Sequence, residues 1–397
     1  MAKGIVSRSL LLDGAFFVRN VAQFPSEYFI GSAPSAPLFY ALARGLEALF
    51  GRAEWVYRVV PLAYTVAGVV LLAMHLIRQY TKPVVLVSVC LLALSCPLVN
   101  YAANAHTFAA DFFATTVLLL TAFRLFENFS TRHWIAWLAL AGLFLLFSFP
   151  ALFTTFACAA TLTAMDIKTG RGRILRIKLA GLAVLSVFAA ALVFSLYLRQ
   201  ATGRNDLNYW SVHFPASRHP LALAKFAYLN TLNAVGFLFF NGQNGLAGLF
   251  LAFLGGAFLI HKGRTPMLAA CGTAIGITVL AAALQKWPYG AIRTVLFLVP
   301  AFLLPMAEGL ELAWNSTKRR GSKALVGCAM ASLVIPQTWV LKLTVMPAGD
   351  SEEAVKTLSR SMAPEIRDTD RFLVYYSAEV QFLHFFKDRV AQAVYQT

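Results

Sequence analysis

The sequence from residue 57 to residue 78 decides the class of fold. It reads YRVVPLAYTVAGVVLLAMHLIR, an apolar run with an arginine near each end. A helix needs about 20 apolar residues to cross the hydrocarbon core of a bilayer. The run therefore predicts a membrane-spanning helix, entered at Arg58 and left at Arg78.

The composition of the whole chain agrees with this first helix. Of 397 residues, 59% are hydrophobic and only 13% are charged, and 33 are Phe. Soluble domains carry about 25% charged residues. So much apolar surface requires lipid as the solvent, and in lipid the backbone satisfies its hydrogen bonds within helices. We therefore predict an all-α polytopic membrane protein. The net charge of +16 reflects basic loops and does not indicate a nucleic-acid partner.

Ten apolar segments have roughly the length of a membrane span. They cover residues 57–78, 83–100, 107–125, 134–149, 150–167, 179–198, 245–262, 266–285, 291–312 and 324–342. The fourth and fifth meet at Ser148-Phe149-Pro150, where either a hairpin or one kinked helix is possible.

Orientation follows from the basic residues, which stay on the cytoplasmic side of membrane spans. Alternate loops carry them: Arg78 and Lys82; Arg124 and Arg132; Lys168, Arg171, Arg173, Arg176 and Lys178; Lys262 and Arg264; Lys318, Arg319, Arg320 and Lys323. This pattern predicts a multi-pass protein of the plasma (inner) membrane whose active site faces the periplasm or cell exterior. The outer segments are then 1–56, 199–244, 286–290 and 343–397.

Three regions follow from this topology. Residues 1–56 form an outer-face loop with interfacial helices, and residues 57–342 form the transmembrane domain with its outer loop at 199–244. Residues 343–397 form a small α/β fragment outside the membrane, with a strand near Asp370–Tyr376.

Two segments do not fit the alternation simply. Residues 220–240 are apolar, yet both ends are expected outside, so we predict an interfacial or re-entrant helix. The alternative, an eleventh span, would invert everything after it. Residues 1–12 are too short and too charged to span or to act as a signal peptide. We therefore expect that a preceding span is absent from this chain.

Polar residues interrupt the apolar pattern mainly on the outer side. Asp13 stands within the apolar run 10–18, where a carboxylate is either solvated at the interface or acts as a base. His106 and Asp111 flank the outer start of the third span. An ionisable residue inside a span is costly to bury and marks a candidate functional site.

A second outer loop combines helix breakers with basic residues. It runs Lys286-Trp287-Pro288-Tyr289-Gly290-Ala291-Ile292-Arg293. Cations beside a helix N-terminus favour an anion, and an arginine matches two phosphate oxygens at once. The alternative is that Lys286 and Arg293 reach towards lipid head groups. We find no nucleotide-binding loop or zinc motif, and the five cysteines lack ligand or disulfide spacing.

In order and placement, these motifs resemble those of the C-type (GT-C fold) integral membrane glycosyltransferases, in the bacterial group of protein-mannosyltransferase-like and aminoarabinose-transferase-like enzymes. The matching stretches, in chain order, are Asp13-Gly14, Ala36–Tyr40, Phe50-Gly51, Arg58–Pro61, Tyr101–Asp111, Trp287–Gly290 with Arg293, and Asp368–Phe386. The chain departs from the family pattern at Gly14, where the family has a second acid. It departs again at Asn104 and His106, where the family has Glu and Lys.

The resemblance implies a chemistry. A sugar on a polyprenyl phosphate would be transferred, with inversion, to an acceptor hydroxyl at the outer face of the cell envelope. Asp13 would be the general base, and basic side chains would stabilise the departing phosphate. The candidate substrate-binding residues are Arg58, Asn104, His106, Asp111, Lys286, Tyr289 and Arg293.

The resemblance implies no cofactor besides the lipid-linked donor, and leaves divalent metal dependence open. The partners it implies are membrane lipid, the polyprenyl-phosphate sugar and a glycan, lipid or protein acceptor. Two alternatives remain. The chain is a catalytically inactive relative that binds polyprenyl phosphate or scaffolds other proteins, or it transports a lipid or sugar.

Overall fold

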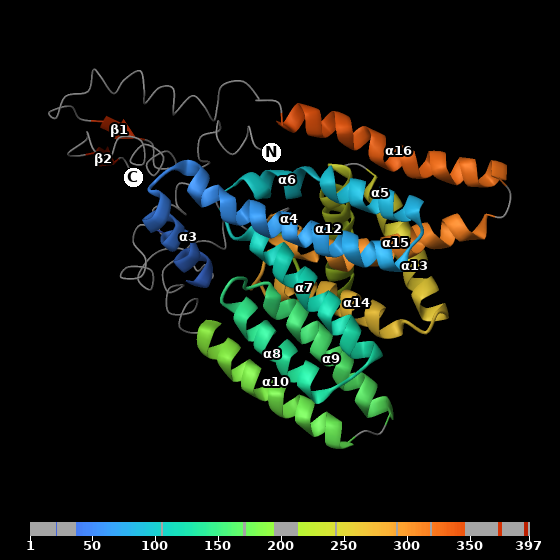
Figure 1. Cartoon of the computed structure of the whole chain (residues 1–397), viewed down its shortest axis with the longest axis horizontal. Helices are drawn as coiled ribbons and strands as arrows, with labels where there is room; N and C mark the ends of the chain where they lie inside the picture. The colour runs from blue at the N-terminus through green and yellow to red at the C-terminus, as the bar shows by residue number, and fades with distance from the viewer. Residues whose placement is uncertain are drawn as a thin grey trace.

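The computed structural model describes residues 21, 37–104, 106–169, 172–193, 213–242, 244–290, 293–317, 320–345, 372–374 and 393–395. These residues form a helical bundle, with α3 at one end and α16 along one edge (Figure 1). Asp13 and most of the predicted outer segment 1–56 lie outside the described residues.

The described helices follow the predicted segments closely. In chain order they are α3 (Pro37–Phe50), α4 (Glu54–Gln79), α5 (Lys82–Ala93), α6 (Cys96–Ala103), α7 (Phe108–Glu127), α8 (Thr131–Leu145), α9 (Ala151–Thr169), α10 (Gly172–Val193), α12 (Pro220–Phe240), α13 (Gly245–His261), α14 (Thr265–Ala283), the 3-10 helix η3 (Arg293–Leu298), α15 (Val299–Ser316) and α16 (Arg320–Val345).

Fewer of these helices qualify as full spans than the ten segments predicted. By length and composition, five described helices can cross a membrane: α4, α7, α12, α14 and η3 with α15. The pair α5 and α6, bent by 49°, makes a sixth if counted as one broken span. The remaining predicted segments are helical too: α8 and α13 have 15 and 17 residues, whereas α9, α10 and α16 have 19, 22 and 26. The polytopic all-α class is confirmed.

The hairpin at residues 146–150 is confirmed, and the single kinked helix is wrong. Helix α8 ends at Leu145 and α9 begins at Ala151. Between them, the Ser148 hydroxyl accepts a hydrogen bond from the Ala151 amide (3.2 Å). This bond satisfies one of the amides that a helix start leaves without an intrahelical partner. The chain therefore turns back here.

Buried carboxylates on α15 tie two basic loops to one face of the bundle. Glu308 accepts hydrogen bonds from the Tyr80 hydroxyl (3.1 Å) and from Lys262 Nζ (3.0 Å). Glu311 accepts from the Thr81 amide (3.0 Å). The α4–α5 and α13–α14 loops therefore meet on the same side, as the alternation of basic loops predicts.

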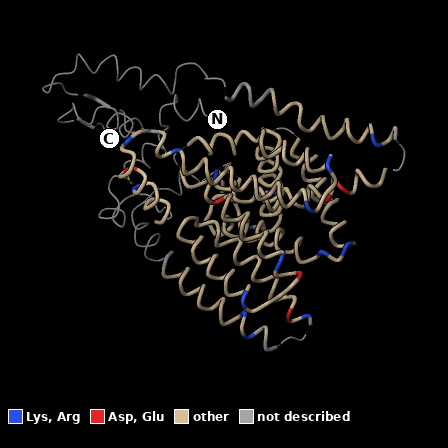
Figure 2. The backbone as a smooth tube through the Cα atoms, viewed as in Figure 1, with Lys and Arg blue, Asp and Glu red and all other residues tan. Residues whose placement is uncertain are grey.

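The ends of α7, α8, α9 and α10 extend this side. Lys178 of α10 is buried, pairs with Asp166 of α9 (2.6 Å) and lies 4.0 Å from the ring of Phe129, which joins α7 to α8. We call this side, with its loops at 79–82, 128–130 and 261–264, the basic face. Many of the Lys and Arg residues gather there, at the helix ends on the right and lower right of Figure 2.

Helix α12 enters the bundle without reaching the basic face. It is long and apolar enough to span, but it ends at Asn241, whose side chain accepts from the Cys96 amide (3.0 Å) and donates to Gln337 (2.6 Å). Cys96 starts α6, at the bend of the broken span. Helix α13 then leads to Lys262 at the basic face. Helices α12 and α13 are therefore joined near the bend of the broken span.

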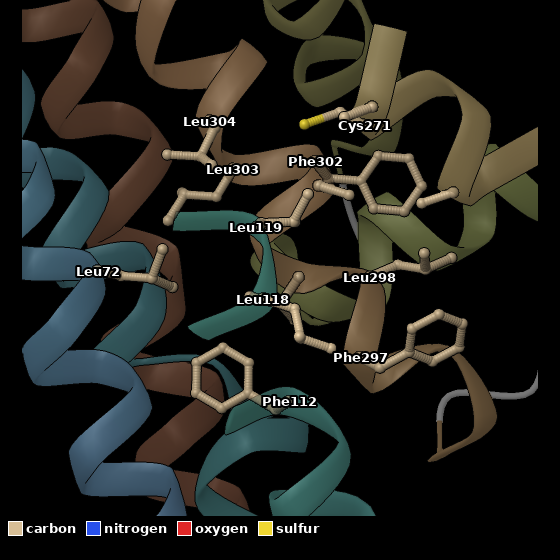
Figure 3. Close-up of a cluster of buried hydrophobic side chains, with 14 of the residues drawn as sticks. Leu72, Phe112, Leu118, Leu119, Cys271, Phe297, Leu298, Phe302, Leu303 and Leu304 are labelled. Atoms are coloured by element: carbon tan, nitrogen blue, oxygen red, sulfur yellow. The ribbon is translucent and has the colours of Figure 1, made fainter. Parts of the chain in front are cut away.

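Helix α15 forms the centre of the core. In the apolar 18-residue stretch of the candidate span made of η3 and α15, 94% of the residues are buried. The corresponding share is 33% for α4 and for α14. Figure 3 shows its side chains Phe302, Leu303 and Leu304 among those of α4, α7 and α14. Glycines allow α13 to approach it closely: a Cβ on Gly255 would overlap the carbonyl oxygen of Pro305.

A two-stranded sheet is the described part of the C-terminal region. Strand β1 (Phe372–Val374) pairs in parallel with β2 (Ala393–Tyr395). The first strand lies within the predicted one, and the second was not predicted, because three residues at a chain end show no periodicity.

Cysteine labelling will test the two faces. In a background with the exposed Cys328 replaced by Ala, we expect Arg176→Cys and Lys323→Cys to react only from the cytoplasm. Arg218→Cys should react only from outside. The reason is the retention of basic loops on the cytoplasmic side. Labelling of Lys323→Cys from outside would show that a span has been miscounted.

Candidate functional site

The face opposite the basic one is built from three turns, at residues 104–107, 146–150 and 284–290. Aromatic contacts hold the turns together. The ring of Phe153, in the first turn of α9, packs against Trp287 and Phe297, with centroids 5.7 Å apart in each pair. Helix α3 joins them through the amide of Leu38, which donates to the carbonyl of Leu146 (2.9 Å). We call this side the opposite face.

The turn between α6 and α7 fixes the ring of His106. Its Nδ1 accepts a hydrogen bond from the Thr107 amide (2.8 Å), and its own amide donates to the Asn104 carbonyl (2.8 Å). The imidazole stacks on Phe108, with centroids 3.9 Å apart and planes 6° from parallel. Because Nδ1 accepts, the neutral ring carries its proton on Nε2. His106 is therefore oriented as a hydrogen-bond donor through Nε2.

Asp111 lies buried in the first turn of α7, where the helix dipole favours a carboxylate. Its side chain is hydrogen-bonded to Ser148 in the α8–α9 turn. One turn further along α7, the hydroxyl of Thr115 meets that of Thr154 on α9 (3.1 Å). Asp111 therefore links the start of α7 to the α8–α9 turn.

Arg58 is enclosed at the end of α4 that lies on the opposite face. It is one of the largest fully buried side chains, only 2% exposed. Its neighbours Tyr57 and Val60 pack with Phe39 of α3 and Ala110 of α7 in a small apolar cluster. A guanidinium stays charged in a protein. This end of α4 therefore contains a fixed positive charge.

The loop before η3 is anchored to α12. The hydroxyl of Tyr289 bonds with that of Thr231 (2.7 Å), and burial raises the pKa of Tyr289 to about 12. Gly290 has φ +97°, and a Cβ there would overlap the side chain of Asn230. Lys286, by contrast, is exposed. The loop therefore has a rigid centre and a solvent-facing lysine.

Arg293 does not start an α-helix, which corrects the prediction. It begins the 3-10 helix η3, and the α-helix starts only at Val299, followed by a proline that suits a first helical turn. Hydrogen bonds across the loop hold η3 in place: Trp287 Nε1 donates to the Thr294 carbonyl (3.1 Å), and the Thr294 hydroxyl donates to the Pro288 carbonyl (2.8 Å). Arg293 therefore does not lie at the N-terminus of an α-helix, where an anion was expected.

His213 is a polar neighbour of this loop that the sequence did not indicate. Its carbonyl accepts from the Tyr289 amide (3.2 Å). Burial and then the charge of Arg293 lower the pKa of His213, and both disfavour the charged ring. In the sequence, the only feature that could have indicated His213 is its position within an aromatic stretch of the 199–244 loop.

The opposite face thus carries all seven of the predicted substrate-binding residues. They are Arg58, Asn104, His106, Asp111, Lys286, Tyr289 and Arg293. Asp13 lies outside the described residues, and its role stays a prediction. Within the described ranges, no three His, Cys, Asp or Glu side chains form a group that could hold a metal ion.

Comparison with known proteins shows a likeness in structure alone. No family model matches the sequence, and no curated protein matches it either. The apo crystal structure of ArnT from Cupriavidus metallidurans has a similar fold, with a TM-score of 0.60. The match covers 99% of this chain and 83% of that chain, at 13% sequence identity.

An identity of 13% shows the fold and nothing finer. The match nevertheless extends over almost the whole chain. The chain has a GT-C-like fold, as the order of its sequence motifs predicted.

Proposed function

We propose that this protein is a membrane glycosyltransferase that takes a sugar from a polyprenyl-phosphate donor. The observation that carries the proposal is the GT-C-like fold over almost the whole chain, combined with the collection of polar candidates on one face. The sugar would be transferred to an acceptor hydroxyl at the periplasmic or outer surface of the inner membrane.

The reaction needs a base on the acceptor and positive charge at the leaving phosphate. In the proposed step the acceptor oxygen attacks the anomeric carbon as Asp13 takes its proton. The bond to the lipid phosphate breaks, and the phosphate leaves with the electron pair. Attack from the face opposite the leaving group inverts the anomeric carbon.

The opposite face provides groups that suit the phosphate. Arg293 is partly exposed, Lys286 is exposed, and His106 is oriented as a donor. Charge-assisted hydrogen bonds from such groups to a phosphate are roughly twice as strong as neutral ones. They gain value in the transition state because negative charge grows on the leaving oxygen. Arg58, which is buried, would act at longer range.

Arg293→Ala should weaken donor binding by about 10- to 100-fold, since a hydrogen bond to a charged group contributes about 1.5–3 kcal/mol. Titration of a fluorescent polyprenyl-phosphate sugar onto the detergent-solubilised protein measures this. Arg218→Ala is the matched control, an exposed arginine just before α12, and should bind as the wild type does. Equal affinities for all three proteins would remove Arg293 from the site.

Transfer itself is tested in liposomes containing radiolabelled polyprenyl-phosphate sugars and a panel of glycan, lipid and protein acceptors. We expect label to move to one acceptor class, with release of polyprenyl phosphate. Binding without transfer would favour the inactive relative. Appearance of intact donor on the other side of the membrane would favour a transporter.

A further inference from the structure

Three arginines lie at helix ends on the basic face, far from the candidate site. Arg78 lies in the last turn of α4, Arg124 in the last turn of α7, and Arg264 precedes α14. All three act electrostatically on the ring of His75. That ring also packs against Phe123, with centroids 6.3 Å apart, so α4 and α7 lie side by side at this end.

The buried carboxylate of Glu308, close to these arginines, interacts with two basic residues. Glu308 pairs with Lys262 (3.0 Å) and lies 3.6 Å from Arg264. Arg78 and Arg124 are both exposed, and in the described part of the chain no carboxylate lies within ion-pair distance of either. The exposed Glu127, one turn beyond Arg124, makes no such pair within those ranges. Positive charge therefore exceeds negative charge in the cluster: Glu308 is shared between Lys262 and Arg264, and Arg78 and Arg124 are left with no acid at ion-pair distance in the described residues.

An apolar stripe on α4 leads directly to this charge. Its exposed side chains recur every three or four residues, and Met74 is one turn before Arg78. The stripe consists of Val66, Val70, Met74 and Ile77, each between 45% and 64% exposed. From Val66 to Arg78 the helix rises about 18 Å, close to half of a hydrocarbon core about 30 Å thick. The stripe therefore extends through roughly one leaflet.

We propose that Arg78, Arg124 and Arg264 bind the phosphate of an anionic phospholipid from the leaflet on the basic face. The acyl chain lies along the apolar stripe of α4. An inorganic phosphate ion would match the arginines but would leave the stripe unused, so the combination selects a lipid. The site is independent of the proposed transferase activity, because it lies at the other end of α4 from Arg58.

The test compares lipid binding to variants of the full chain. Fluorescent phosphatidylglycerol is titrated onto protein in neutral detergent, with phosphatidylcholine as the uncharged reference. A basic side chain at an anionic surface contributes about fivefold in affinity. The double variant Arg78→Gln/Arg124→Gln should therefore bind phosphatidylglycerol about 25-fold more weakly. The control Arg132→Gln/Arg176→Gln removes two other exposed basic residues on the same face and should bind normally.

Two further arms separate the possible outcomes. Inorganic phosphate should fail to displace the lipid; effective displacement would show a site for soluble anions and overturn the proposal. Val70→Ser/Met74→Ser keeps the arginines and removes apolar contact, so it should also weaken lipid binding. Unchanged affinity in this variant, or equal affinity in the two arginine variants, would overturn the proposal as well.

Discussion

Replacing Asp13 by Asn should reduce sugar transfer by about 10²- to 10⁴-fold, the usual contribution of a general base. Asparagine keeps the size of the side chain and its capacity to hydrogen-bond, but it takes no proton at neutral pH. Donor binding should persist, because the groups proposed for the phosphate lie on other segments. The measurement is the initial rate of transfer in liposomes, at saturating donor.

Glu127→Gln is the matched control for this substitution. It makes the equivalent change from acid to amide at an exposed position on the basic face, and its rate should equal that of the wild type. If Asp13→Asn transfers sugar at the wild-type rate, Asp13 is not the base. If the wild type binds donor and transfers nothing, Gly14 and Asn104 mark a protein that kept the fold and lost the reaction.

Gly255→Ala should destabilise the helical bundle by about 3 kcal/mol, at the upper end of the usual cost of overpacking. The added Cβ would overlap the backbone of Pro305, and backbone in a central helix moves less easily than a side chain. The close contact is matched from the other side, where a Cβ on Gly309 would overlap the carbonyl of Leu251. Thermal unfolding in detergent, followed by size-exclusion chromatography, measures the loss.

Gly276→Ala provides the control for that experiment. This glycine is also inside an apolar helix, α14, but a Cβ there meets nothing within 4 Å. Because alanine is the better helix former by up to about 1 kcal/mol, the variant should be as stable as the wild type or slightly more so. Equal destabilisation by both substitutions would show that the α13–α15 contact is not the cause.

Helix positions were predictable because apolar length and basic loops are local properties of the sequence. The run 57–78 lies within α4, and the hairpin at Pro150 follows from the proline and the missing basic residues. The count of full spans was less predictable. The bend between α5 and α6 has a local signal, because Ser95 caps α6 and Pro97 lies in its first turn, but the contact of Cys96 with Asn241 depends on the fold.

The sequence could assign the candidate residues to one face of the bundle, but it could not predict their geometry. Placing Asn104, His106 and Arg293 on one side required only the alternation of loops. The hydrogen bond from the Ser148 hydroxyl to Asp111 and the start of α15 six residues after Arg293 both depend on packing between distant helices. His213 was missed because its relation to Arg293 is spatial, across 80 residues of sequence.

The hydrogen bonds of Asn241 have a consequence for how the protein is made. Its side chain joins the amide of Cys96 to Gln337, so one junction uses residues from early, middle and late parts of the chain. During synthesis α6 enters the membrane long before Gln337 emerges from the ribosome. The amide of Cys96 gains its acceptor only when Asn241 has been made. An unsatisfied amide in hydrocarbon costs several kcal/mol. The junction is complete only after α16 has also been made, because Asn241 then donates to Gln337.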